Sequence, residues 1–192
     1  QTCALPIYVG AEYAASQKPD GYSLLLHSNV LAINLNFYKE QRYDPVKDFA
    51  PISVVGEFPH LLVINAALAP KTLPELVAFS KQGKPPFYGS TATNTSLALE
   101  AVKRATGLQA ERVNFSGAAP AILALLAGDV HMMMTSPSTV LDNIKAGKMR
   151  GIVITTRGRS SLLPSVPTAA ESGVANYADS QWLGMLAQIG RA

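Results

Sequence analysis

The sequence predicts an α/β protein whose parallel strands are covered by helices on both faces. Short apolar runs alternate with helix-forming segments almost without interruption along the 192 residues. The apolar runs at residues 61–64 and 132–134 are continuous rather than alternating, which is typical of strands buried on both faces. A chain of this length can bury one large core or two smaller ones.

In the first half of the chain we expect three strands and one helix. A turn at Pro19-Asp20-Gly21 precedes the first strand. Thr72 is predicted to cap the helix, with Pro74 in its first turn and Glu75 completing a capping box. The expected strands are residues 22–26, 52–55 and 61–64, and the expected helix is 72–81.

The second half is predicted to contain three consecutive strand–helix units followed by two more strands. Gly107 and Gly147 are expected to end the first and third of these helices. The expected strands are residues 87–88, 112–115, 130–134, 151–155 and 182–186, and the expected helices are 96–106, 119–127 and 138–146. Residues 66–149 are expected to form one lobe, and residues 1–65 and 150–192 parts of another.

The composition excludes several classes of protein. With 48% hydrophobic and 15% charged residues the chain is globular, and its net charge of +3 is too diffuse to indicate nucleic-acid binding. Cys3 is the only cysteine, and the three histidines are far apart in sequence, so we expect no disulfide within the chain and no metal site. No apolar run is long enough to span a bilayer, and no signal peptide is visible.

Small polar residues gather where the predicted strands lead into helices, and this is where α/β sheets bind ligands. The loops concerned are residues 27–29, 90–96, 116–120 and 135–138. The loop from Ser90 to Ser96 is the strongest candidate. Its hydroxyls and amide exceed what an ordinary helix cap needs, and a helix start favours an anion. These loops predict a ligand site rich in neutral donors and nearly devoid of charge.

Catalytic patterns are mostly absent, so an enzyme is the weaker class. The sequence has no nucleophile elbow, no phosphate-binding loop and no dinucleotide-binding glycine motif. Ser90 lacks an obvious base, since His27 or His131 would supply one only by a coincidence of folding. We expect His131 to be a satisfied core or edge histidine, and Met132, Met133 and Met134 to fill a core or hinge face.

Several segments together resemble the solute-binding proteins of tripartite tricarboxylate transporters, the Bug receptors. The resemblance runs from about residue 9 to residue 187. It is carried by Pro19-Asp-Gly-Tyr-Ser-Leu-Leu-Leu26, Tyr43-Asp-Pro-Val-Lys-Asp-Phe-Ala-Pro-Ile52, Tyr88-Gly-Ser90, Gly117-Ala-Ala-Pro-Ala121, Ile144-Lys-Ala-Gly-Lys148 and Leu163-Pro-Ser-Val-Pro-Thr-Ala-Ala-Glu-Ser-Gly173. It implies a type II periplasmic-binding-protein fold, in which two Rossmann-like lobes enclose a small carboxylate in a cleft and deliver it to membrane transporter subunits.

The resemblance also implies a set of ligand-binding residues, no cofactor, a periplasmic location and a monomer. The residues carried over by position are Ser28, Asn29, Ser90, Thr91, Asn94, Thr95, Ser96, Gly117, Ala118, Thr135 and Ser136, with Gly117 and Ala118 as backbone donors. Two segments depart from the family pattern. Asn114-Phe-Ser116 replaces the usual Pro-Tyr-Lys or Pro-Tyr-Arg, and Thr135-Ser-Pro137 stands where an aspartate is often found.

The ends of the chain depart further from the family. Members begin with a strand and a glycine-rich loop upstream of the position of Gly10, and they continue beyond Ala187. We therefore expect a fragment in which one lobe is incomplete and exposes a sheet edge and apolar surface. Two other functions stay open at this point. One is the effector-binding domain of a transcription regulator, for which no helix-turn-helix is evident, and the other is a hydrolase that uses Ser90 or Ser96.

Overall fold

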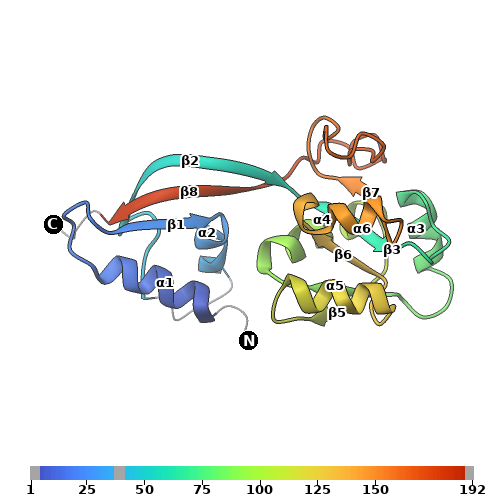
Figure 1. Ribbon diagram of the computed structural model, residues 1–192, viewed down its shortest axis with the longest axis horizontal. Coiled ribbons are helices and arrows are strands. Elements are labelled where there is room, and N and C mark those ends of the chain that lie inside the picture. The colour runs from blue at the N-terminus through green and yellow to red at the C-terminus, as the bar shows by residue number, and fades with distance from the viewer. Residues whose placement is uncertain (1–4, 37–41, 189–192) are drawn as a thin grey trace. The chain divides into compact units, whose positions relative to one another are not determined.

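The computed structural model describes residues 5–36 and 42–188, which fall into two compact units (Figure 1). One unit comprises residues 1–58 and 181–192, and the other comprises residues 59–180. The helices are α1 (Leu5–Ser16), α2 (Val30–Ile33), the 3-10 helix η1 (Asn34–Asn36), α3 (Leu73–Ser80), α4 (Thr93–Thr106), α5 (Ala118–Ala127) and α6 (Pro137–Lys145). The strands are β1 (Leu24–Ser28), β2 (Phe49–Pro59), β3 (Leu61–Asn65), β4 (Phe87–Ser90), β5 (Glu111–Asn114), β6 (Met132–Thr135), β7 (Met149–Ile154) and β8 (Ser180–Gln188).

The larger unit is built on a five-stranded sheet in the order β5-β4-β6-β3-β7. Strand β4 runs parallel to β5 and β6, as the sequence predicts, but β3 runs antiparallel to both β6 and β7. The expectation of an entirely parallel sheet was therefore wrong. A continuous apolar run reports burial on both faces, but it carries no information about strand direction.

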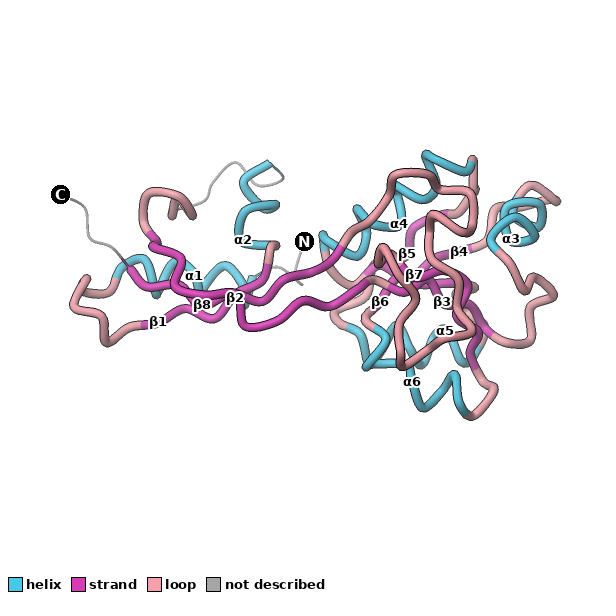
Figure 2. The backbone as a smooth tube through the Cα atoms, turned by 90° about the horizontal axis from the view of Figure 1, so that it is seen from above, coloured by secondary structure: helices cyan, strands magenta, loops and turns pink. Residues whose placement is uncertain are grey.

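Helices cover both faces of this sheet (Figure 2). Helices α3 and α4 pack on one face through residues such as Leu76 and Leu99, and α5 and α6 pack on the other through Leu125 and Val140. Strand β3 shows the consequence, because all four residues from Leu61 to Ile64 have no exposed surface. The three methionines of β6 are buried in the same way, which confirms the prediction that they fill a core.

The smaller unit has a three-stranded sheet in the order β1-β8-β2. Strands β1 and β8 pair antiparallel, with Leu25 opposite Leu186. These two residues pack in a core with Ala11, Leu31 and Phe49. The alternate residues Leu24 and Leu26 are each 53% exposed, so the sheet in this unit is covered on only one face. Helix α1, which supplies Ala11, was not predicted.

The predicted helix boundaries hold closely in the larger unit. The Thr72 hydroxyl accepts the backbone N–H of Glu75, and the Glu75 carboxylate accepts the N–H of Lys71. Gly107 ends α4 in the left-handed conformation, with a φ of 72°, and Gly147 follows α6 with a φ of 69°. Both positions favour glycine because a Cβ atom destabilises this conformation.

The compact units divide the chain differently from the lobes expected at residues 66 and 149. Strand β3 pairs with β6 and with β7, so residues 59–65 and 150–180 belong to the larger unit. The chain therefore crosses between the units after Phe58 and before Gln181. Strand pairing sets these boundaries, and pairing is not visible in an apolar run.

Candidate functional site

The polar loops lie at one end of the strands of the five-stranded sheet, along the border that crosses all five strands. Strands β4, β5 and β6 all end at this edge because they run parallel. Strand β3 starts there, since Leu61 pairs with Thr135 at the end of β6. Strand β7 ends there as well, with Ile154 opposite Leu61. In order across the sheet, this edge carries Asn114, Ser90, Thr135, His60 and Thr155, and we refer to it as the polar edge.

Ser90 and Ser96 form a buried pair at the polar edge. Their Oγ atoms are 2.6 Å apart, and the two residues are 3% and 5% exposed. Ser96 Oγ also donates to the carbonyl of Ala92 at 2.8 Å. A hydroxyl has one proton, so Ser90 is the donor between the two serines. The pair ties the end of β4 to the first turn of α4.

Three helices begin at the polar edge without a side-chain cap. The N-cap residues of α4, α5 and α6 are Ala92, Gly117 and Ser136, and none of them accepts a helix amide through its side chain. The Ser136 hydroxyl contacts that of Ser138 at 3.1 Å. The first-turn amides and the helix dipoles therefore contribute positive potential at this edge.

Thr135 gives the other face of the sheet a buried hydroxyl at the same edge. It is 4% exposed, and its Oγ1 lies 2.9 Å from Oγ1 of Thr139. Thr139 in turn donates to the Ser136 carbonyl at 2.7 Å. These hydroxyls join the end of β6 to the first turn of α6, much as the Ser90–Ser96 pair joins the end of β4 to the first turn of α4.

The structure brings most of the candidate residues together. Those of the larger unit lie at the polar edge, on β4, β6 and the first turns of α4, α5 and α6: Ser90, Thr91, Asn94, Thr95, Ser96, Gly117, Ala118, Thr135 and Ser136. Ser28 and Asn29 lie in the smaller unit, at the end of β1 and at the start of α2.

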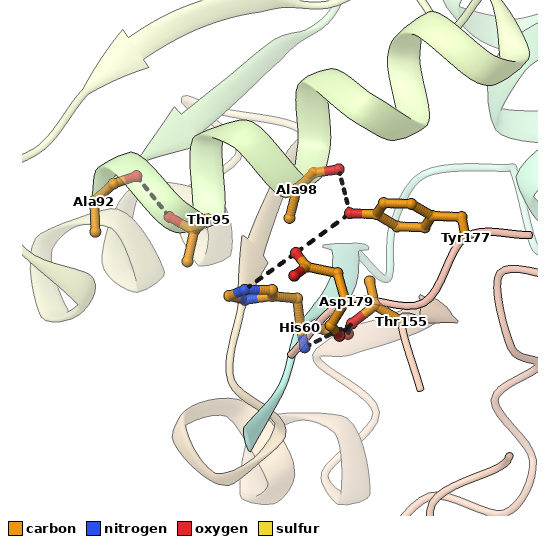
Figure 3. Close-up of polar contacts among 7 residues, drawn as sticks. All are labelled: His60, Ala92, Thr95, Ala98, Thr155, Tyr177 and Asp179. Atoms are coloured by element: carbon orange, nitrogen blue, oxygen red, sulfur yellow. Dashed lines mark hydrogen bonds and ion pairs between the residues drawn. The ribbon is translucent and has the colours of Figure 1, made fainter. Parts of the chain in front are cut away.

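Four residues at the polar edge were missed by the sequence analysis: His60, Thr155, Tyr177 and Asp179 (Figure 3). Thr155 accepts the backbone N–H of His60 at 2.9 Å, and its own N–H donates to the His60 carbonyl at 2.9 Å. Asp179 donates its N–H to the Thr155 carbonyl at 2.9 Å. Thr155 thus holds both segments that lead out of the larger unit.

The side chains of the same group interact beside α4. Nε2 of His60 is 3.6 Å from Oδ2 of Asp179, and the Tyr177 hydroxyl lies within reach of that carboxylate and of the Ala98 carbonyl. Burial lowers the pKa of His60, and the charge of Asp179 opposes this shift. Burial and the same carboxylate raise the pKa of Tyr177. The predicted start of a strand at residue 61 could have indicated that His60 lies at this edge, if the direction of that strand had been known.

The other two histidines have polar contacts of their own. His131 accepts the Phe87 N–H through Nδ1 at 3.0 Å, at the opposite edge of the sheet, which confirms the expectation of a satisfied histidine. His27 lies in the smaller unit with Nδ1 3.0 Å from the Ser28 carbonyl. Over residues 5–36 and 42–188, no three His, Cys, Asp or Glu residues gather as metal ligands. No helix in that part of the chain is long and apolar enough to cross a membrane.

The fold is that of the periplasmic binding proteins. The structure of the periplasmic binding protein BugD superposes with a TM-score of 0.85 at 27% identity, over 95% of this chain and 62% of BugD. An adipate-bound protein of R. palustris, Rpa4515, gives 0.87 at 30% identity over 96% and 63%. MatC from Rhodopseudomonas palustris with bound malate gives 0.80 at 26% identity over 95% and 64%.

The chain belongs to the tripartite tricarboxylate transporter family of receptors, whose model matches residues 6–191. It is 32% identical to protein BugT of Bordetella pertussis over 95% of this chain and 57% of that protein. It is 30% identical to an Agrobacterium vitis protein of the ttuE-ttuC' intergenic region over 91% and 51%. The predicted family is confirmed, and the chain spans about half the length of these relatives. No comparison supports a transcription regulator or a hydrolase.

Proposed function

We propose that this chain is the ligand-binding part of a periplasmic receptor that captures a small organic carboxylate for a tripartite tricarboxylate transporter. It binds its ligand without chemical conversion and passes it to membrane subunits of the transporter. The receptor works as a monomer and needs no cofactor.

One observation carries the proposal: three helix N-termini without side-chain caps start at the polar edge. Each offers backbone amides and partial positive charge, which together favour an anion. The buried hydroxyls of Ser90, Ser96 and Thr135 stand at the same edge. A carboxylate is the anion that the family context favours, because two relatives of known structure hold adipate and malate.

Adipate and malate are both dicarboxylates, so we propose a dicarboxylate of similar size as the ligand of this chain. The proposed contacts come from the helix starts of the larger unit. Neutral donors at several points suit a ligand with two anionic groups, since each group can be held without a permanent counter-charge.

The proposal is tested by titrating the chain with a panel of carboxylates and measuring heat of binding and thermal stability. The panel contains adipate, malate and citrate, with an amine and a sugar as controls. A ligand at about a hundred times its Kd adds roughly 2.7 kcal/mol to the stability of a folded receptor. Stabilisation by one class of acid supports the proposal, and a cooperative transition that no acid shifts contradicts it.

Variants locate the site. Ser90→Ala and Asn94→Ala should each weaken carboxylate binding by roughly 1 to 3 kcal/mol, because a charged ligand loses a partner or a correctly positioned helix start. Ser161→Ala is the matched control, since Ser161 is exposed and lies outside the polar edge. Unchanged affinity in both site variants would exclude this loop from the site.

A further inference from the structure

His60 lies inside the row of residues that forms the polar edge. Leu61 pairs with Thr135 on one side and with Ile154 on the other, so His60 lies between Ser136 and Thr155. His60 has the same parity along β3 as Leu62 and Ile64, which pack on the face that α3 and α4 cover. Ser90 shares that face, because it has the parity of Tyr88 along β4.

The imidazole of His60 is buried with one ring nitrogen that makes no hydrogen bond. The residue is 1% exposed, and Nε2 has no hydrogen-bond partner among the described residues. Oδ2 of Asp179 lies 3.6 Å from this nitrogen (Figure 3). The Asp179 side chain is 34% exposed, whereas the imidazole is shielded from solvent.

The remaining groups around His60 do not neutralise this pair. Thr155 directly after β7 and Ser136 at the start of α6 are uncharged, and Tyr177 stays protonated because its pKa is raised. On α4, Glu100 is paired with Lys103 at 2.7 Å. Since burial lowers the pKa of His60, the pair carries one negative charge at neutral pH.

That charge stands at an edge whose helix starts favour anions. Strands are about 4.8 Å apart, so the start of β3 is about 10 Å from the end of β4. Interactions over such a distance are only partly screened at physiological ionic strength. A bound dianion therefore meets repulsion from Asp179 unless His60 takes up a proton.

We propose that His60 and Asp179 regulate the charge of the ligand site, so that the receptor takes up a proton at His60 when it binds a dicarboxylate. The inference rests on the proposed function and adds a specificity-determining pair to it. Proton uptake turns the pair from negative to neutral and tightens binding as the pH falls. A monoanionic acid meets less repulsion, so it gains less from the same step.

The first arm measures binding of adipate and malate by calorimetry at pH 7.5. Asp179→Asn should bind both dianions about three- to tenfold more tightly, because a like charge at about 10 Å is removed. Asp129→Asn is the matched control. It removes the same charge from an exposed residue before β6, at the opposite edge, and should leave the affinity unchanged.

The second arm measures the protons taken up on binding, from calorimetric titrations in buffers of different ionisation enthalpy. The unaltered chain should take up a fraction of a proton that grows as the pH falls from 8 toward 6. His60→Gln should abolish this uptake and flatten the pH profile of the affinity. A residue with only a structural role would change the affinity without removing the proton uptake.

The experiments distinguish failure of the proposal about His60 and Asp179 from failure of the proposed receptor function. Binding of adipate or malate without proton uptake, and with no gain in Asp179→Asn, overturns the pair and leaves the receptor intact. If no carboxylate binds at all, the receptor proposal fails, and the His60 titration followed by NMR decides on the pair. A His60 pKa that falls in Asp179→Asn supports the coupling, and an unchanged pKa overturns it.

Discussion

Oγ of Ser90 lies 2.6 Å from Oγ of Ser96, in a buried contact that joins the last residue of β4 to the first turn of α4. The strand and the helix are thereby fixed at the point where the helix amides point outward. The contact uses neutral groups only, so it orients the helix dipole toward the polar edge without adding a charge that would compete with it.

Ser96→Ala removes this contact and the bond from Ser96 to the Ala92 carbonyl. The variant should lose about 1 to 2 kcal/mol in free energy of unfolding, because the buried Ser90 hydroxyl loses its acceptor. Urea denaturation followed by circular dichroism measures the loss. Ser138→Ala, at an exposed position, serves as the control and should change stability by less than about 0.5 kcal/mol.

Thr155→Val tests the residue that holds both connecting segments. Its hydroxyl accepts the buried N–H of His60 at 2.9 Å, so valine leaves that donor unsatisfied. We expect a loss of about 1 to 3 kcal/mol in unfolding free energy. Thr155→Ser keeps the hydroxyl and should recover most of this loss, and a Thr155→Val variant as stable as the unaltered chain would contradict the role of the hydroxyl.

Gly151→Ala should destabilise the larger unit through a steric clash on β7. A Cβ atom at this position would lie 2.8 Å from Cγ2 of Val166. Overpacking of this kind costs about 1 to 3 kcal/mol. The double variant Gly151→Ala/Val166→Ala should regain part of that loss. Gly158→Ala is the control, because a Cβ atom there meets nothing within 4 Å.

Glu171→Gln should show a pH-dependent effect on stability. Its carboxylate accepts the Thr168 N–H at 2.8 Å and pairs with Arg159 at 2.9 Å, and these contacts lower its pKa. A carboxyl group whose pKa is lowered in the folded state stabilises the fold at pH values above the ordinary pKa of glutamate. This stabilisation is lost as the pH falls through the lowered pKa. The variant should therefore be less stable than the unaltered chain at pH 7, and this difference should shrink as the pH falls toward about 3. A penalty that is the same at both pH values would contradict this assignment.

The sequence by itself determined much of the local structure. Helix α3 begins at its predicted cap, Thr72, and α4 ends at the predicted Gly107, because caps and left-handed glycines are local features of the chain. Apolar runs located β3 and β6 because burial on both faces requires unbroken hydrophobicity. The family was also readable from the sequence, since its motifs are continuous segments.

Tertiary structure alone decided how these elements combine. The antiparallel direction of β3 places His60 at the polar edge beside Thr155, nearly a hundred residues later in the chain. Asp179 reaches the same histidine from the segment before β8. Strand direction and pairing arise from contacts between distant residues, and no local pattern encodes them. The neutral residues of the candidate site could therefore be predicted from the sequence. The titratable residues His60 and Asp179 could be recognised only from the assembled sheet.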